Sequence, residues 1–182
     1  MVEITYQMVL STIQTIGILV GIIYYLFIMR NSQRNQELTL KAQEHALETR
    51  QAQLFMEIYN EYRNKEFQRN ISSIYNIWEW EGYDDFQEKY GRSTNSEAYS
   101  SFASVNSYFE GMGLLVQRGY IDPQLVEDLL GGAIIRYWER IRPLTMERRE
   151  RRDWPELCEW FEHLYDVIKT IRDKNRTHDL DR

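Results

Sequence analysis

The side chains that most often carry catalysis are scarce in this chain. Its one cysteine, Cys158, and one of its three histidines, His163, stand five residues apart in a segment that predicts a helix. At about 100° per residue they point roughly 140° away from each other, so they cannot form a nucleophile–base pair. No Gly-x-Ser-x-Gly, P-loop or dinucleotide-binding pattern is present. These features predict that the protein is not an enzyme.

Metal chemistry lacks its ligands as well. A di-iron carboxylate bundle needs two Glu-x-x-His pairs, and no histidine here follows a glutamate by three residues. A zinc site could draw on Cys158, Glu159, Glu162 and His163, but the chain has no second cysteine. We therefore expect no metal ion and no other cofactor. The net charge of −6 argues against nucleic acid as a partner.

Glu110 is the carboxylate whose sequence surroundings set it apart. It lies between Phe109 and Met112 in an apolar helical segment, so we expect at least partial burial. A buried carboxylate needs a charged or hydrogen-bonding partner. The predicted partner is Arg136, which would form a buried ion pair, and Arg118 is the alternative. A second interpretation is that Glu110 binds a ligand in a small cleft.

Two further groups of residues could contact a partner. The first is aromatic, and we expect it to form an exposed patch for a protein: Trp78, Trp80, Tyr83 and Phe86. The second lies in a stretch with seven arginines between positions 136 and 152, partly offset by acidic neighbours. Such a run is typical of a solvated helix face with local ion pairs. The alternative is contact with anionic lipid head groups, each basic residue adding about 1 kcal/mol, through Arg148, Arg149, Arg151 and Arg152.

The elements that must position these residues begin with a run of 22 uncharged residues, Met8 to Met29. As a helix it would extend about 33 Å, the thickness of a bilayer's hydrocarbon core. No basic n-region and no small-residue cleavage site accompany it, so a membrane anchor is favoured over a signal peptide. Arg30, Arg34 and Lys41 follow the run and no basic residue precedes it. This pattern predicts a single-pass protein of the cell membrane whose C-terminal domain lies in the cytoplasm. The single cysteine is typical of a reducing compartment.

One face of this predicted span carries small and polar residues at helical spacing. A Gly-x-x-x-Gly pair lets helix backbones approach closely, and a glutamine can hydrogen-bond across such a contact. The alternative is that glycine is simply common in membrane helices. The predicted association face consists of Ser11, Gln14, Gly17 and Gly21.

The rest of the pattern predicts an all-α chain. Residues 1–30 form the tail and span, 31–53 a polar helical stalk, 54–174 a cytoplasmic helical bundle, and 175–182 a frayed tail. Within the bundle, Gly119 should end a helix that starts near Glu97. Asp122 and Pro123 should open the next helix, which Pro143 should end. A last helix should start in a capping box at 153–156 and reach about Arg172.

Three segments carry a resemblance: Tyr75–Phe86, Tyr108–Asp122 and Ile135–Glu139. Over roughly Arg50 to Lys169 the chain resembles a prokaryotic family described as a domain of unknown function. That resemblance implies a small protein with one N-terminal membrane span and an α-helical cytoplasmic domain. It implies no activity and no catalytic residue.

Two functions from different classes follow. The preferred one is a membrane-anchored interaction or scaffold module, self-associating or acting as a subunit of a membrane complex. Its partners would be the lipid bilayer and either a protein or a second copy, without nucleic acid. The alternative is a ligand-sensing regulatory domain with a small cleft near Glu110. A closed apolar pocket lined by Glu110 would favour sensing, whereas a solid core with an exposed aromatic patch would favour partner binding.

Overall fold

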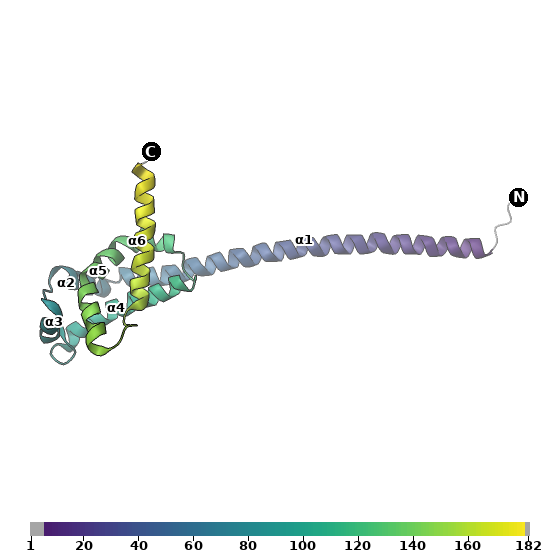
Figure 1. Cartoon of the computed structure of the whole chain (residues 1–182). Coiled ribbons are helices and arrows are strands. Elements are labelled where there is room, and N and C mark those ends of the chain that lie inside the picture. The colour runs from purple at the N-terminus through teal and green to yellow at the C-terminus, as the bar shows by residue number, and fades with distance from the viewer. Residues whose placement is uncertain (1–5, 181–182) are drawn as a thin grey trace. The chain divides into compact units, whose positions relative to one another are not determined.

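Six α-helices and short connections make up residues 6–180, the part of the chain that a computed structural model describes (Figure 1). The helices are α1 (Tyr6–Arg63), α2 (Lys65–Asn76), α3 (Gly82–Tyr90), α4 (Ser96–Gln117), α5 (Pro123–Arg152) and α6 (Glu159–Leu180). No strand occurs among residues 6–180, which confirms the predicted all-α class. Contacts divide the chain into two units, Met1–Thr49 and Arg50–Arg182.

The described part of the first unit is a single helix, residues 6–49 of α1, with every side chain exposed. Its most apolar window of 18 residues has a mean hydropathy of 2.0. Within residues 6–180 this is the helix that is long and apolar enough to cross a membrane, judged by length and composition. The polar stretch after it is helical as predicted, with an ion pair between Lys41 and Glu37 (2.8 Å) on its surface.

Side chains placed at the helix ends explain most of the boundaries in the second unit. Asn64 separates α1 from α2 and accepts a hydrogen bond from the Glu66 amide at 2.9 Å. Asp122 does the same for α5, accepting from the Gln124 amide at 2.9 Å, with Pro123 as the first helical residue. After α4, Gly119 adopts a φ of +71°, the left-handed conformation that glycine favours. These three ends follow directly from local sequence.

The prediction that Pro143 ends a helix was wrong. α5 continues through Pro143 to Arg152, where Asp153 takes a left-handed φ of 48°. Proline removes one hydrogen bond, the one to the carbonyl of Glu139, and both residues are exposed, so water can satisfy that carbonyl. The buried side chains on both sides of Pro143, Ile141 and Leu144, hold the helix against the core.

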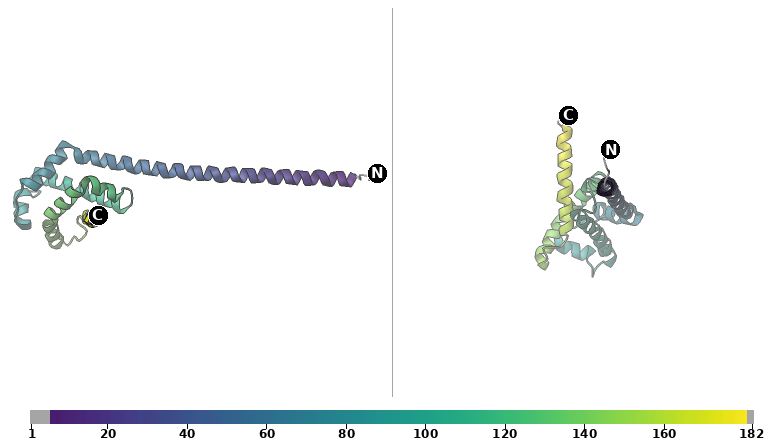
Figure 2. Two further views of the ribbon diagram at one scale, coloured as in Figure 1. Left: turned by 90° about the horizontal axis from the view of Figure 1, so that it is seen from above. Right: turned by 90° about the vertical axis from the view of Figure 1, so that its right-hand side faces the viewer.

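The predicted bounds of the last helix were also wrong. Residues 153–158 form a connecting segment, here called the α5–α6 loop, and α6 begins only at Glu159. The helix then runs to Leu180, beyond the predicted end near Arg172. Figures 1 and 2 both show the C-terminal turns of α6, in yellow, extending past the other helices of this unit. The exposure of residues 173–177 agrees with that view.

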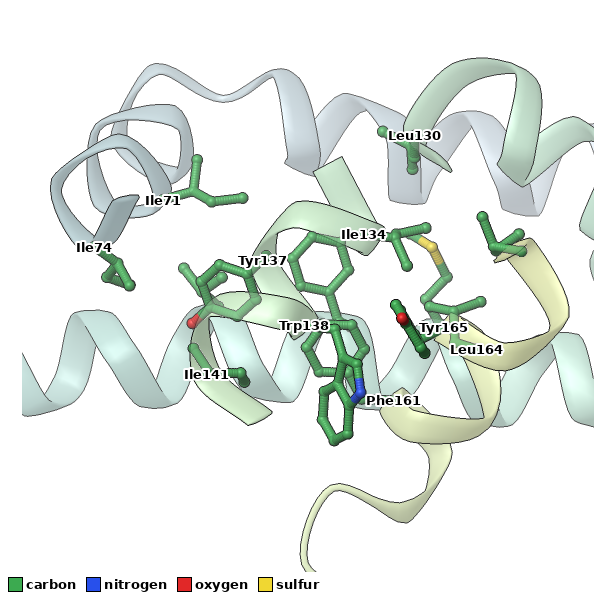
Figure 3. Packing of buried hydrophobic residues seen from close by; sticks show 14 of the residues in the cluster. Ile71, Ile74, Leu130, Ile134, Tyr137, Trp138, Ile141, Phe161, Leu164 and Tyr165 are labelled. Carbon is green, nitrogen blue, oxygen red and sulfur yellow. The ribbon is translucent and has the colours of Figure 1, made fainter. Parts of the chain in front are cut away.

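An aromatic cluster at the junction of α4, α5 and α6 forms the centre of the core (Figure 3). The rings of Phe109 and Phe161 stack with centroids 4.9 Å apart, and Trp138 meets Phe161 edge-on at the same distance. All three side chains are fully buried. Helices α4 and α6 approach closely at Gly113, where a side-chain Cβ would lie 2.0 Å from the carbonyl oxygen of Trp160. This contact places the start of α6 against the C-terminal part of α4.

Candidate functional site

A partly open pocket of about 530 Å³ lies among α3, α4, α5 and the α5–α6 loop. Its volume falls within the range of small-molecule binding sites. Polar and aromatic side chains both contribute to its wall. The lining residues that matter below are Tyr83, Arg92, Tyr99, Phe102, Asn106, Ser107, Glu110, Arg148, Arg152, Trp154, Glu156 and Cys158.

Three arginines give the pocket a basic wall. Arg148 donates from Nη2 to the hydroxyl of Tyr99 at 3.3 Å, and Arg152 donates from Nε to the hydroxyl of Tyr83 at 3.3 Å. Neither they nor Arg92 forms a salt bridge with any carboxylate in the described part of the chain. Hydroxyl partners orient these guanidinium groups without neutralising their charge.

Among the described residues, two buried polar atoms in the pocket lining have no hydrogen-bond partner. The side chain of Asn106 is 8% exposed; its Nδ2 donates to the carbonyl of Phe102 at 2.7 Å, and its Oδ1 accepts nothing. The Nε of Arg148 likewise donates to nothing. Leaving such a group unpaired costs about 1–3 kcal/mol, so a water molecule or a bound ligand is needed as its partner.

Glu110 also lines this pocket and contacts the start of α6. Its carboxylate accepts hydrogen bonds from the backbone amides of Phe161 (2.8 Å) and Trp160 (3.4 Å). These amides belong to the first turn of a helix and have no partner within it, so a carboxylate stabilises them. Glu110 thus connects α4 to α6 through the backbone rather than through a basic side chain.

The prediction of an ion pair between Glu110 and Arg136 was therefore wrong. Arg136 donates to its own helix at the carbonyl of Gly132 (3.2 Å), and its guanidinium lies 5.8 Å from the ring centre of Tyr75. The other suggested partner, Arg118, is exposed at the end of α4. Sequence spacing indicated that Glu110 needs a partner, but it could not show that a distant helix supplies backbone amides.

Burial raises the pKa of the Glu110 carboxyl above its ordinary value of 4.5, although the amides of Phe161 and Trp160 act to lower it. The folded state then holds the proton more tightly than the unfolded chain. Consequently the free energy of unfolding falls as the pH rises from 4.5 through the raised pKa. Glu110→Gln cannot titrate, so over that interval the wild type should lose stability relative to this variant.

Urea unfolding of the wild type and Glu110→Gln at steps from about pH 4 to about pH 8 measures this difference. The two free energies should diverge progressively as the carboxyl ionises. A difference between them that is the same at every pH would contradict the assignment.

Cys158 also faces the pocket, in the α5–α6 loop, with a left-handed φ of 58°. Burial, with Glu110 as the next contributor, raises the pKa of its thiol to about 11. The thiol is therefore protonated and a poor nucleophile at neutral pH. No group of three or more His, Cys, Asp or Glu side chains suited to a metal ion occurs where the chain is described, residues 158–163 included.

The predicted aromatic partner patch is not an exposed surface. Phe86 and Tyr83 are buried at 1% and 8% exposure. Trp78 stacks on Tyr90 with centroids 4.3 Å apart, and Trp80 packs edge-on against Phe86 while the guanidinium of Arg140 covers its other face at 3.9 Å. The prediction was wrong because the α2–α3 connection folds these rings into the domain.

The four arginines of the predicted lipid contact form hydrogen bonds or ion pairs with other residues of the domain. Arg148 and Arg152 line the pocket, as described above. Arg149 binds Glu162 at 2.6 Å and the carbonyl of Leu157 at 2.9 Å. Arg151 binds both oxygens of Asp84, at 2.6 and 2.9 Å, and a third bond joins it to Glu147. Contact with anionic lipid through these residues stays a prediction.

The predicted association face of the span is exposed, as is the whole of residues 6–50. A Cβ atom at Gly17 or Gly21 would meet nothing within 4 Å. Ser11 donates to the carbonyl of Met8 at 3.0 Å, within its own helix. Association through Ser11, Gln14, Gly17 and Gly21 stays a prediction.

Sequence reasoning missed Asn106 and the basic wall around it. One signal was available: Asn106 stands beside Val105, between Phe102 and Phe109, on the apolar side of a predicted helix. A polar residue in that position is either paired or functional. No comparable signal marks Arg92, because it lies in a polar turn far from α5 in sequence.

Fold and site together define an all-α chain in which a long apolar helix precedes a helical domain with a partly open pocket beside Glu110. The family model described as a domain of unknown function (DUF4760) matches residues 11–169, so the chain belongs to this family. The match confirms the predicted resemblance to a domain of unknown function and extends into the apolar helix, whereas the prokaryotic origin and the membrane anchor that the resemblance implied stay predictions. No curated protein and no solved structure matches the chain.

Proposed function

We propose that this protein is a membrane-anchored regulatory domain that binds a small molecule in the pocket beside Glu110. The observation that carries the proposal is the unpartnered Oδ1 of the buried Asn106, in the lining of a 530 Å³ pocket. A side chain that needs an external partner and a cavity able to hold one occur at the same place. The protonated Cys158 thiol favours binding over covalent chemistry.

This choice reverses the order that the sequence favoured. An exposed patch at Trp78, Trp80, Tyr83 and Phe86 would have favoured the interaction or scaffold hypothesis, but those side chains are buried or half-buried. The sensing hypothesis depended on a pocket lined by Glu110. Such a pocket is present, although it is partly open and carries polar groups where a closed apolar one was expected.

The proposal of a membrane anchor is supported by the apolar part of α1. Its most apolar stretch of 18 residues has a mean hydropathy of 2.0, and none of these residues is buried. A helix with this composition is stable in a bilayer because its backbone is hydrogen-bonded internally. The basic residues that follow the apolar run favour a cytoplasmic C-terminal domain. After cell fractionation, the full-length protein should stay in the membrane pellet through an alkaline carbonate wash. Release of the protein into the supernatant would contradict the proposed membrane anchor.

The pocket can be blocked from α4 without touching the core. Ser107 is exposed and lines the pocket, whereas Ser104 is exposed on the same helix and does not. Ser107→Trp should fill the pocket, and Ser104→Trp is the matched control. A protein-free small-molecule extract of the producing cells should raise the melting temperature of the wild type and of Ser104→Trp, and leave Ser107→Trp unchanged.

The expected rise is several degrees, because a ligand at about a hundred times its dissociation constant adds about 2.7 kcal/mol to the free energy of unfolding. The measurement is thermal unfolding of the purified full-length chain in mild detergent, followed by tryptophan fluorescence. An extract that stabilises none of the three proteins, or that stabilises Ser107→Trp as much as the wild type, would contradict the proposed function.

A further inference from the structure

The acidic and the basic side chains around the pocket differ in their hydrogen-bond and ion-pair partners. On the acidic side, both oxygens of Glu110 are committed to the backbone amides of α6, and Glu156 is exposed. On the basic side, Arg148 and Arg152 have only tyrosine hydroxyls as partners, and Arg92 has no carboxylate partner among residues 6–177. An incoming group therefore meets unneutralised positive charge.

The two unpartnered atoms specify complementary chemistry. The Nε of Arg148 can only donate, so it needs an acceptor, and a charged acceptor forms the stronger bond. The Oδ1 of Asn106 can only accept, so it needs a donor, and that assignment is fixed because Nδ2 already donates to the carbonyl of Phe102. One molecule that satisfies both atoms must carry an acceptor, for which an acidic group forms the stronger bond, and an O–H or N–H group.

Part of the remaining wall is apolar. Phe86 and Phe102 form part of the lining, and Trp154, which is 48% exposed, stands at the α5–α6 loop. Aromatic faces of this kind suit a planar or hydrocarbon part of a ligand. Inorganic phosphate or sulfate would leave this surface and most of the 530 Å³ unused.

We propose that the pocket binds a small organic anion, a carboxylate or phosphate ester, that also carries a hydroxyl or amine donor. Its acidic group pairs with Arg148 and Arg152, its donor binds the Oδ1 of Asn106, and its carbon skeleton covers Phe102. This inference rests on the proposed function and names the chemical class of its ligand.

Anion-exchange fractionation of the small-molecule extract tests the class directly. The probes are the fraction retained by the resin at neutral pH and the fraction that flows through. With the full-length protein, the retained fraction should raise the melting temperature and the flow-through should not. Stabilisation confined to the flow-through would overturn the anionic class while leaving the proposed function intact. An extract without effect before fractionation would overturn both.

Variants connect the effect to the named atoms. Arg148→Gln should raise the amount of retained fraction needed for half-maximal stabilisation by about tenfold or more, since a hydrogen bond to a charged group is worth about 1.5–3 kcal/mol. Arg142→Gln, exposed on the same helix, is the control and should match the wild type. Asn106→Leu removes the acceptor for the donor group of the ligand and should weaken the response as well. Equal responses from Arg148→Gln and Arg142→Gln would overturn the assignment, and Arg152→Gln repeats the test if Arg148→Gln does not fold.

Discussion

Replacing Gly113 with alanine should lower the free energy of unfolding of the helical domain by about 3 kcal/mol. The added Cβ would lie 2.0 Å from the carbonyl oxygen of Trp160 and 3.3 Å from the Cβ of Leu164. Both obstacles belong to the rigid start of α6, so neither can turn away as a long side chain would. Helix α6 must shift, and the stacked rings of Phe109 and Phe161 shift with it. Urea unfolding of the full-length chain in mild detergent measures the loss.

Gly111 provides the matched control on the same helix. It is exposed, and an added Cβ would meet nothing within 4 Å. Gly111→Ala should therefore gain about 0.5–1 kcal/mol from helix propensity alone. Equal effects of the two substitutions would show that α6 does not pack on α4 at Gly113.

Arg149→Ala should cost about 2–3 kcal/mol of the free energy of unfolding. The guanidinium joins Glu162 (2.6 Å) to the carbonyl of Leu157 (2.9 Å), and its side chain is only 15% exposed. Truncation leaves a half-buried carboxylate and a loop carbonyl without their donor. It also frees the α5–α6 loop, which carries Cys158 into the pocket wall.

Arg142→Ala is the control for the loss of one arginine from α5. Arg142 is exposed, and its removal should change the free energy of unfolding by no more than about 0.5 kcal/mol. Arg149→Lys should recover part of the loss, because an ammonium group can reach one acceptor but not hold both in a fixed fork. An Arg149→Ala variant as stable as Arg142→Ala would contradict the structural role of this pair.

Both substitutions act on the contacts that build the pocket. Gly113 sets the approach of α6 to α4, and Glu110, one turn earlier on α4, receives the first amides of α6. Arg149 fixes the connection between α5 and α6 from the other side. The packing of α6 on α4 and α5 therefore supports the pocket, whose polar atoms come from segments distant in sequence.

Local sequence was sufficient wherever a side chain acts on its own neighbours. Asp122 and Pro123 predict the start of α5, and Gly119 predicts the end of α4, because capping and left-handed turns involve only a few adjacent residues. The all-α class follows in the same way from helical spacing of apolar residues. Glu110 stood out because a carboxylate among apolar neighbours needs a partner.

Tertiary contacts account for what the sequence did not predict. Pro143 does not end α5, because Ile141 and Leu144 are buried on either side of it. The partner of Glu110 is the backbone at Trp160 and Phe161, which no side-chain pattern encodes. The four aromatic residues predicted as a patch are folded inward, because amphipathic spacing cannot tell a domain's core from a partner's interface.

The measurement that tests the central claim most directly is the native mass spectrum of the full-length protein, extracted in mild detergent from its own membrane. The account predicts a bound small molecule on the wild type that is lost from Ser107→Trp and kept by Ser104→Trp. The same spectrum reports a second copy if the face at Gly17 and Gly21 associates. A wild-type protein that carries a stoichiometric protein partner and no small molecule would contradict the ligand-binding function and return the scaffold hypothesis to first place.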